Sequence, residues 1–315
     1  MVRWQAHHFI CSKYQSLKAK GPIDFYRRLH RTMRCLLLLV SLLSVSTYGQ
    51  KAPLVNFNHL FIVIDSADLR ALRQSAFINN KFAAVVTRTT KADSAETWTG
   101  TYFEGLDNYI ELFDVSVGDP LGNVGMGFSV DRIGDLKRLD SVLSKYGPTE
   151  IRLREKQEDR GKVPWYSSLI INDTAFYSTS SISFWVMEYK PEYYDYHRWK
   201  YKDSTLTRTT YLNQYEDQRL NKILKRFTGA TLQARDNERQ VLSDFLLHCG
   251  YQKMSDGSLV SPEHFVIHFM DRKTADRYAI ASLEFETNRP LSDTVKISST
   301  IEVRIQNTAG KIIFK

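Results

Sequence analysis

The sequence predicts an α+β fold in which one βαβββ arrangement occurs twice and is followed by a C-terminal extension of helices and strands. Short runs rich in β-branched and aromatic residues alternate with turn residues, as expected of strands. In each half, one segment with apolar residues at helical spacing follows the first strand-like run, and three further runs follow that segment. A repeated unit of this kind indicates two copies that pack around a shared core.

The first unit begins with the run Asn-His-Leu-Phe-Ile-Val-Ile-Asp at residues 58–65, which is typical of a strand. Residues 66–77 are predicted to form a helix, because Ser66 or Asp68 can cap its N-terminus and apolar side chains recur at helical spacing. Three more strands complete the unit, at residues 82–90, 96–102 and 108–115.

The second unit repeats this order. Residues 125–131 read as a strand, and residues 135–146 read as a helix with four apolar residues at helical spacing. Gly147 supplies the stop of that helix. Three strands follow, at residues 150–155, 165–172 and 181–189.

The C-terminal extension covers residues 191–315 and is predicted to pack on the paired domain of residues 50–190, since no Gly/Ser-rich or Pro-rich linker separates them. Its tyrosine- and tryptophan-rich stretch at 193–201 reads either as a loop packed over the core or as a sugar- or partner-binding surface. Helices are expected at residues 211–227 and 238–248, strands at 264–270, 278–286, 296–305 and 311–314, and a turn at 307–310.

The first 49 residues have the pattern of a secretory signal peptide. Ten mostly apolar residues, 36–45, follow four arginines and precede small residues at Thr47 and Gly49. This run is about half of the ~20 residues that a membrane-spanning helix needs, so no stable membrane anchor is expected. The mature chain is predicted to begin near Gln50 and to be secreted or periplasmic. Met33 would be a tidier start, which makes the residues before it an upstream extension of the reading frame; a buried N-terminal helix is the alternative.

The charge of the chain lies mostly in this leader. The whole sequence carries 43 Lys and Arg against 35 Asp and Glu, a net of +8. Eight of the basic residues and one acidic residue precede Gln50, which leaves 35 against 34 and a net of +1. A nearly neutral mature chain argues against nucleic acid as a partner. Cys249 is the one cysteine after the leader, so the sequence also excludes a disulfide-stapled scaffold.

Two polar residues interrupt the apolar runs of the first unit. His59 lies at the start of its first strand, and Glu111 lies in Tyr-Ile-Glu-Leu-Phe of its fourth strand. A histidine and a carboxylate on neighbouring strands can point into one concave face and share a metal ion.

These motifs and the repeated order resemble the vicinal oxygen chelate superfamily, which includes glyoxalase I, the extradiol dioxygenases and the bleomycin-resistance proteins. The resemblance covers residues 56–190. It implies that the paired modules form a cupped mixed sheet around a divalent metal, with ligands from strands one and four of each module.

Carried over residue by residue, the resemblance implies a metal site of His59, Glu111 and Glu188, with Gly125 at the fourth position, where no side chain can bind. The metal would be zinc, nickel, manganese or iron. The implied activity is that of a metal-dependent lyase, isomerase or dioxygenase on a small carbonyl or enolisable substrate, with Glu188 or Glu111 as general base.

The alternative prediction is a metal-free binding module for a small ligand or a glycan. The empty fourth position and the aromatic content of the strands favour it, and its substrate-binding wall would comprise Trp98, Tyr102, Tyr109 and Trp185. A third hypothesis assigns a partner-binding interface to the C-terminal extension. The sequence does not predict an oligomeric state.

Overall fold

The computed structural model describes residues 53–93 and 96–315, so the predicted signal peptide lies outside the described residues. These described residues form one compact unit. Within the part of this unit that is described, no helix is both long and apolar enough to cross a membrane.

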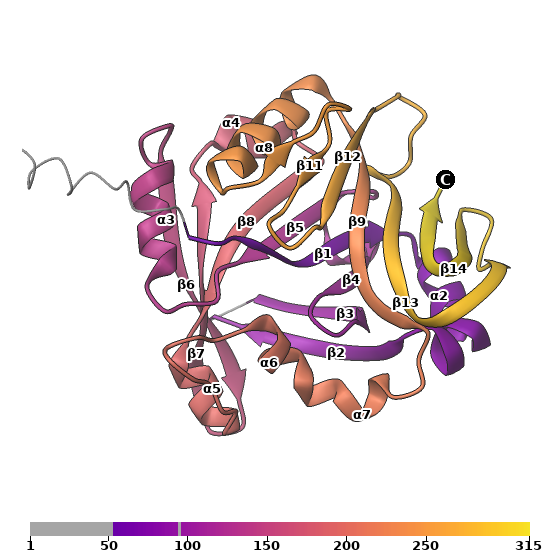
Figure 1. Cartoon of the computed structure of the whole chain (residues 1–315), viewed down its shortest axis with the longest axis horizontal. Helices are drawn as coiled ribbons and strands as arrows, with labels where there is room; N and C mark the ends of the chain where they lie inside the picture. The colour runs from indigo at the N-terminus through magenta and orange to yellow at the C-terminus, as the bar shows by residue number, and fades with distance from the viewer. Residues whose placement is uncertain (1–52, 94–95) are drawn as a thin grey trace, which may run out of the picture. The chain divides into compact units, whose positions relative to one another are not determined.

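The α+β fold predicted from the sequence is confirmed, and the βαβββ order occurs twice (Figure 1). The first module consists of β1 (Asn56–Ile64), α2 (Ser66–Gln74), the π-helical turn η2 (Phe77–Phe82), β2 (Ala84–Ala92), β3 (Glu96–Glu104), β4 (Tyr109–Asp114) and the short 3-10 turn η3 (Val115–Val117). The second consists of β5 (Val124–Ser129), α3 (Asp135–Leu143), β6 (Thr149–Glu158), β7 (Gly161–Ile171), α4 (Thr174–Thr179) and β8 (Ile182–Tyr189).

The strands of both modules form one closed barrel in the order β1-β4-β3-β2-β6-β7-β8-β5. The modules meet along the antiparallel pair β1 and β5, where Leu60 lies opposite Met126. On the other side, the register of β2 and β6 contains the pair Ala92 and Lys156 alone among the described residues. The cupped sheet is therefore firmly joined along one seam and barely closed along the other.

Strand alternation divides the barrel into two faces. In β1 the outward side chains Leu60 and Ile62 join the main hydrophobic core, whereas His59 and Phe61 point inward. The outward residues of β1, β4, β5 and β8 are buried in the main core, whereas the outer face of β6 is exposed. The inner face is left to form a site.

The C-terminal extension contributes a second sheet in the order β10-β11-β12-β9-β13-β14. Its strands are β9 (Leu224–Ala234), β10 (Gln252–Lys253), β11 (Leu259–Val260), β12 (Val266–Asp271), β13 (Ile280–Lys296) and β14 (Ile301–Phe314). Its helices are α5 (Pro191–His197), α6 (Arg208–Leu212), the 3-10 turn η4 (Asn213–Tyr215), α7 (Glu216–Arg219) and α8 (Asp236–His248).

Two predictions for this region were wrong. The helix expected at 211–227 is broken, because α6 ends at Leu212, α7 ends at Arg219 and residues from Leu224 onward enter β9. The turn expected at 307–310 lies inside β14, where Asn307 has a positive φ of 57° and the register with β13 shifts. The chain reverses instead between β13 and β14.

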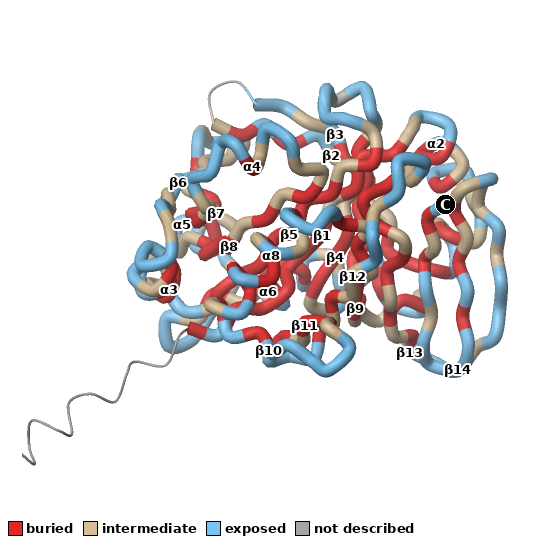
Figure 2. Tube along the Cα trace, turned by 90° about the horizontal axis from the view of Figure 1, so that it is seen from above, coloured by how far each residue is buried: buried red, intermediate tan, exposed pale blue. Residues whose placement is uncertain are grey.

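Aromatic side chains join the barrel to the C-terminal sheet. Phe57 of β1 stacks on Phe265 with ring centroids 3.7 Å apart, and Phe82 meets Phe285 edge to face at 5.0 Å. These rings belong to a single buried cluster that includes residues of both sheets. In Figure 2 the trace is coloured as buried along strands of both sheets. Burial of such large rings is a main source of stability, so the two parts stabilise each other.

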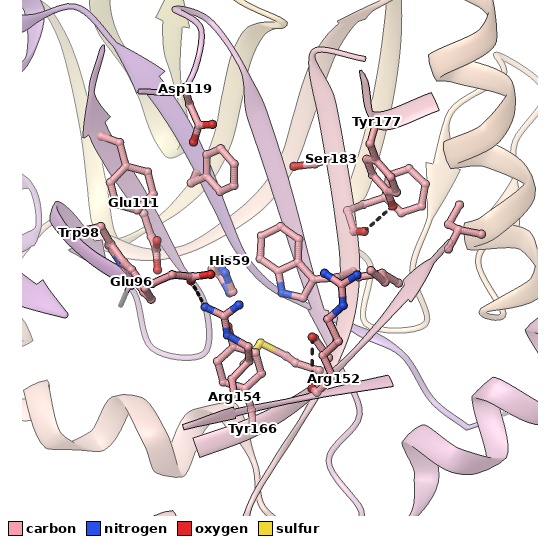
Figure 3. A pocket seen from close by; sticks show the side chains of 18 of the residues that line it. His59, Glu96, Trp98, Glu111, Asp119, Arg152, Arg154, Tyr166, Tyr177 and Ser183 are labelled. Carbon is pink, nitrogen blue, oxygen red and sulfur yellow. Dashed lines mark hydrogen bonds and ion pairs between the residues drawn. The ribbon is translucent and has the colours of Figure 1, made fainter. Parts of the chain in front are cut away.

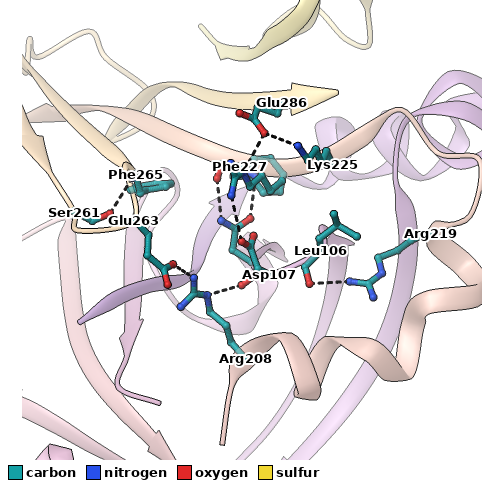
Figure 4. A network of polar contacts seen from close by, with 12 residues as sticks. Leu106, Asp107, Arg208, Arg219, Lys225, Phe227, Ser261, Glu263, Phe265 and Glu286 are labelled. Atoms are coloured by element: carbon teal, nitrogen blue, oxygen red, sulfur yellow. Dashed lines mark hydrogen bonds and ion pairs between the residues drawn. The ribbon is translucent and has the colours of Figure 1, made fainter. Parts of the chain in front are cut away.

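A polar network adds to this junction (Figure 4). The Asn108 amide donates to the Phe227 carbonyl oxygen and accepts from the Phe227 N–H, both at 2.9 Å. Arg208 donates to the Asp107 carbonyl oxygen at 2.7 Å, and Arg219 donates to that of Gly105 at 2.6 Å. The loop between β3 and β4 is thereby fixed to α6, α7 and β9.

The tyrosine- and tryptophan-rich stretch packs partly as core, although its last aromatic residue, Tyr201, is exposed. Tyr193 and Tyr194 are fully buried, and they belong to a second aromatic cluster inside the barrel. Tyr211 of α6 stacks on Tyr189 of β8 at 5.0 Å. The helices α5, α6 and α7 lie beside β2 and β7, on the other side of the barrel from α8 (Figure 1). This cluster fills part of the interior, and the remaining space is a cavity.

Candidate functional site

The cavity has a volume of about 1010 Å³ and lies against the inner face of the barrel (Figure 3). We call it the barrel cavity. Both modules contribute to it. Its lining includes His59 and Phe61 of β1, Trp98 of β3, Tyr109, Glu111 and Phe113 of β4, Arg152 and Arg154 of β6, Trp165 and Tyr166 of β7, and Trp185 and Met187 of β8.

His59 is held in one orientation in the wall of the barrel cavity. Its ring stacks on Tyr109 at 4.9 Å and meets the edge of Trp185 at 5.3 Å. Its Nδ1 lies 2.9 Å from Oδ1 of Asn58, whose amide nitrogen donates to the Tyr189 hydroxyl. An amide oxygen only accepts, so Nδ1 carries the proton and Nε2 is the acceptor. Burial lowers the pKa of His59 to about 3, and the Arg88 charge acts in the same direction.

Two glycines of β5 make room for these inward side chains. Gly127 lies opposite His59 in the register, and Gly125 lies opposite Phe61. A Cβ at Gly127 would fall 2.3 Å from Cε1 of His59, and one at Gly125 would fall 2.0 Å from the Phe61 ring. The position that lacks a fourth ligand is therefore occupied by an aromatic ring from the facing strand.

Glu111 lies two residues after Tyr109 and shares its inward direction. Burial raises the pKa of Glu111 to about 7, while the Arg88 charge and the Tyr109 hydroxyl oppose that rise. Figure 3 shows its carboxylate on the same side of the barrel cavity as Trp98 and His59. The site therefore holds one neutral imidazole and one carboxyl group that titrates near neutrality.

Three of the four aromatic residues predicted for the wall, Trp98, Tyr109 and Trp185, line the barrel cavity. Tyr102 does not line it. Its buried ring lies beneath, with the Arg88 guanidinium 3.7 Å from the ring centroid. Arg88 also donates to Glu104 at 3.1 Å, so this cation is already paired.

Glu188 lies on the other face of β8 and does not line the barrel cavity. Trp185 and Met187 point inward, and alternation turns Glu188 outward. Its Oε2 accepts a hydrogen bond from the Leu136 N–H at 2.9 Å, in the first turn of α3. The assignment of Glu188 as metal ligand and general base is thus corrected: its carboxylate caps a helix whose N-cap residue, Gly134, has no side chain to do so.

Sequence reasoning missed the contribution of β6 and β7. Arg154 lies in the lining and pairs with Asp93 at 3.0 Å and with Glu96. Arg152 makes two hydrogen bonds of 2.7 Å to Glu150. The alternating pattern Arg152-x-Arg154 was a visible signal of one face of a strand, but nothing in the sequence indicated which face was inward.

The donor set of the barrel cavity does not fit the implied metal. His59 and Glu111 reach it, and Glu188 does not. Among the described residues there is no group of three or more His, Cys, Asp or Glu side chains that could hold a metal ion. Catalytic divalent sites normally use about three protein ligands, so the residues present fall short of the glyoxalase arrangement.

No curated protein matches the chain. Among solved structures it is similar to a hypothetical protein from Staphylococcus aureus, with 13% identity, a TM-score of 0.47, and coverage of 78% of this chain and 96% of that one.

A second similar structure is described as a xylose isomerase-like TIM barrel/4-hydroxyphenylpyruvate dioxygenase fusion protein, with 11% identity and a TM-score of 0.32. The similarity covers 73% of this chain and 35% of that one. A family of unknown function (DUF5829) matches over residues 57–314, nearly the whole described chain, and this chain therefore belongs to that family.

Proposed function

We propose that this chain is an exported binding protein of the vicinal oxygen chelate type, whose barrel cavity holds a small ligand with a flat apolar body and needs no metal to do so. The observation that carries the proposal is the lining: rings from β1, β3, β4, β7 and β8 surround a space of about 1010 Å³. Small-molecule sites are typically about 300–1,000 Å³, mostly apolar, with a few polar groups that fix orientation.

The aromatic walls supply the binding energy in this account. Phe61 lies 6.1 Å from Trp185 and 5.6 Å from Phe113, so the rings form a continuous surface. Stacked or edge-to-face ring pairs contribute about 0.5–1.5 kcal/mol beyond the burial of their area. Nε2 of His59 accepts a hydrogen bond, and the Glu111 carboxyl group fixes the polar end of the ligand.

A metal-dependent lyase, isomerase or dioxygenase is the second candidate, because His59 and Glu111 both reach the barrel cavity. It would require further donors from the ligand itself. The two candidates differ in one direct consequence, since a metal-dependent site loses ligand affinity or activity when divalent ions are removed.

Export rests on the leader pattern of residues 1–49. Expression of the full chain with N-terminal sequencing of the recovered protein tests it. We expect a mature protein that begins at or near Gln50 outside the cytoplasm; an uncut chain retained in the cytoplasm would contradict export.

The binding function is tested by ligand-observed NMR with a panel of small aromatic compounds. We expect binders whose signals are displaced by one another and weakened by Trp98→Ala and Trp185→Ala. Tyr146→Ala serves as the matched control, since this side chain is 65% exposed and lies outside the barrel cavity. A panel without binders, or equal effects of all three replacements, would overturn the proposal.

A further inference from the structure

Some charged side chains that line the barrel cavity form ion pairs within the protein, and others do not. Among the described residues of its lining, the acidic side chains are Glu96, Glu111, Asp119 and Asp173, and the basic ones are Arg152 and Arg154. Which charge a ligand would meet depends on which of these groups already have a partner.

Both arginines are committed to carboxylates. Arg154 is held between Asp93 and Glu96, and Arg152 is held by both oxygens of Glu150. His59 adds no positive charge, because Nδ1 alone carries a proton. An anionic ligand would have to compete with these ion pairs. The competition is strongest at Arg154, whose side chain is 21% exposed, whereas the Arg152–Glu150 pair is solvent-exposed and weak.

Glu111 is in the opposite situation. None of the ion pairs formed within residues 53–93 and 96–315 involves it, although it is half-buried in the cavity wall. The nearby Arg88 is bound to Glu104 and packed on Tyr102. A carboxylate without an ion partner in a poorly hydrated place is stabilised by an incoming cation.

The neighbouring rings favour the same charge. Trp98, Tyr109 and Trp185 line the barrel cavity together with Glu111. The face of an aromatic ring carries negative potential, and a cation within about 6 Å of the ring centroid is attracted by about 0.5–2 kcal/mol. Aromatic rings grouped around a carboxylate are an arrangement that binds ammonium groups.

We propose that the barrel cavity takes an organic cation, an amine or quaternary ammonium compound with an apolar body, whose charge lies against Glu111 and among the rings of Trp98, Tyr109 and Trp185. This inference rests on the proposed function, and it names the ligand class of the same site.

Three probes that share a phenyl ring and differ in charge test the inference: benzyltrimethylammonium, 3-phenylpropan-1-ol and 3-phenylpropionate. Calorimetric titration of the full mature chain measures each affinity. We expect the cation to bind at least about tenfold more tightly than the alcohol, from cation–π attraction and pairing with Glu111. The anion is expected to bind more weakly than the alcohol.

The variant Glu111→Gln keeps the shape of the side chain and removes its charge. It should weaken binding of the cation by about tenfold and leave binding of the alcohol unchanged. Asp217→Asn, an exposed carboxylate on α7, is the matched control and should change neither. Thermal unfolding of both variants checks that they are folded.

The outcomes separate the two claims. If the alcohol or the anion binds as tightly as the cation, or if Glu111→Gln leaves binding of the cation unchanged, the charge inference is overturned and the binding function stands. If none of the three probes binds and the aromatic panel is also without binders, both are overturned.

Discussion

The imidazole of His59 is neutral in the folded chain because it is buried against Tyr109 and Trp185. Its pKa falls from 6.5 to about 3. In that interval the unfolded chain binds a proton that the folded chain does not, so this residue's contribution to stability is complete above pH 6.5 and is lost as the pH falls toward 3. The slope approaches about 1.4 kcal/mol per pH unit.

Glu104 and Glu111 act in the opposite sense, because burial raises the pKa of each from 4.5 to about 7. Their contribution is present below pH 4.5 and is lost as the pH rises through 7.

The comparison of wild type with His59→Gln isolates the contribution of the histidine to this pH dependence. Denaturant unfolding across this range should give a stability that falls less steeply toward acid in the variant, and parallel profiles would refute the assignment.

Gly127 is the second residue on which the site depends, since a Cβ there would fall 2.3 Å from the His59 ring. We expect Gly127→Ala to displace the imidazole and to lower the free energy of unfolding by about 1–3 kcal/mol, as overpacking does. Gly147→Ala is the control, because a Cβ there meets nothing within 4 Å. Equal stability of the two variants would contradict the close packing of Gly127 against the His59 ring.

The case of Glu188 shows what the sequence could not decide at this scale. Glu111 and Glu188 both interrupt apolar strands in matching parts of the repeat, and that similarity suggested a shared role. Side chains alternate between the two faces of a strand. A shift of one residue in the assignment therefore moves a side chain to the other face. His59, Trp98, Tyr109 and Trp185 were predicted from residue type and do line the barrel cavity.

Among the elements, α3 depends on a side chain from β8. The Glu188 carboxylate accepts from the Leu136 N–H and places negative charge at the N-terminus of the helix. Glu188→Ala should therefore cost about 1–2 kcal/mol of stability, measured by denaturant unfolding, and leave the affinity for an aromatic probe unchanged.

Glu111→Gln provides the contrast, with an altered affinity for a cationic probe and little change in stability. If Glu188→Ala abolished ligand binding in a chain that still folded, Glu188 would have to be assigned to the ligand site.

Most strands of the paired modules could be predicted because they combine an apolar outer face with turn residues at their ends; β6 is an exception, since Ile151 and Leu153 are exposed. The segment 211–227 could not, since its apolar residues fit a helix by spacing. In the structure Leu224 and Phe227 enter a strand that pairs with β12 and β13, and the ladder of hydrogen bonds to those distant strands decides the conformation. The wrongly predicted turn at Asn307 has the same origin, because a positive φ also occurs at an irregularity within a strand pair.

In the whole described chain, the barrel and the C-terminal sheet share one core. Phe265 is 4% exposed and stacks on Phe57 across their junction. We expect Phe265→Ala to cost about 3–5 kcal/mol, and we expect one unfolding transition by calorimetry and near-ultraviolet circular dichroism. Met270→Ala, at a 52% exposed position of β12, is the control and should change little. Two separate transitions in the wild type would contradict a shared core.

The sequence predicted a cupped sheet with an aromatic wall, but the extent of the barrel cavity could not be predicted from it. Its wall comes from strands of both modules, and the aromatic cluster of α5 and α6 that fills the rest of the interior comes from the extension. Residue types such as Trp98 and Trp185 were visible in the sequence. The closure of the barrel and the ion pairs of Arg152 and Arg154 could not be predicted, because they depend on the register between strands.

The central claim is that the barrel cavity binds an organic ligand without a metal. The most direct measurement is the affinity of an aromatic probe found in the panel, by calorimetry, for the mature chain before and after removal of divalent ions with a chelator, with the metal content of both samples determined. The account predicts the same affinity in both samples. A loss of about tenfold or more on chelation, restored by one divalent metal and absent in His59→Ala, would contradict it and return the site to metal-dependent chemistry.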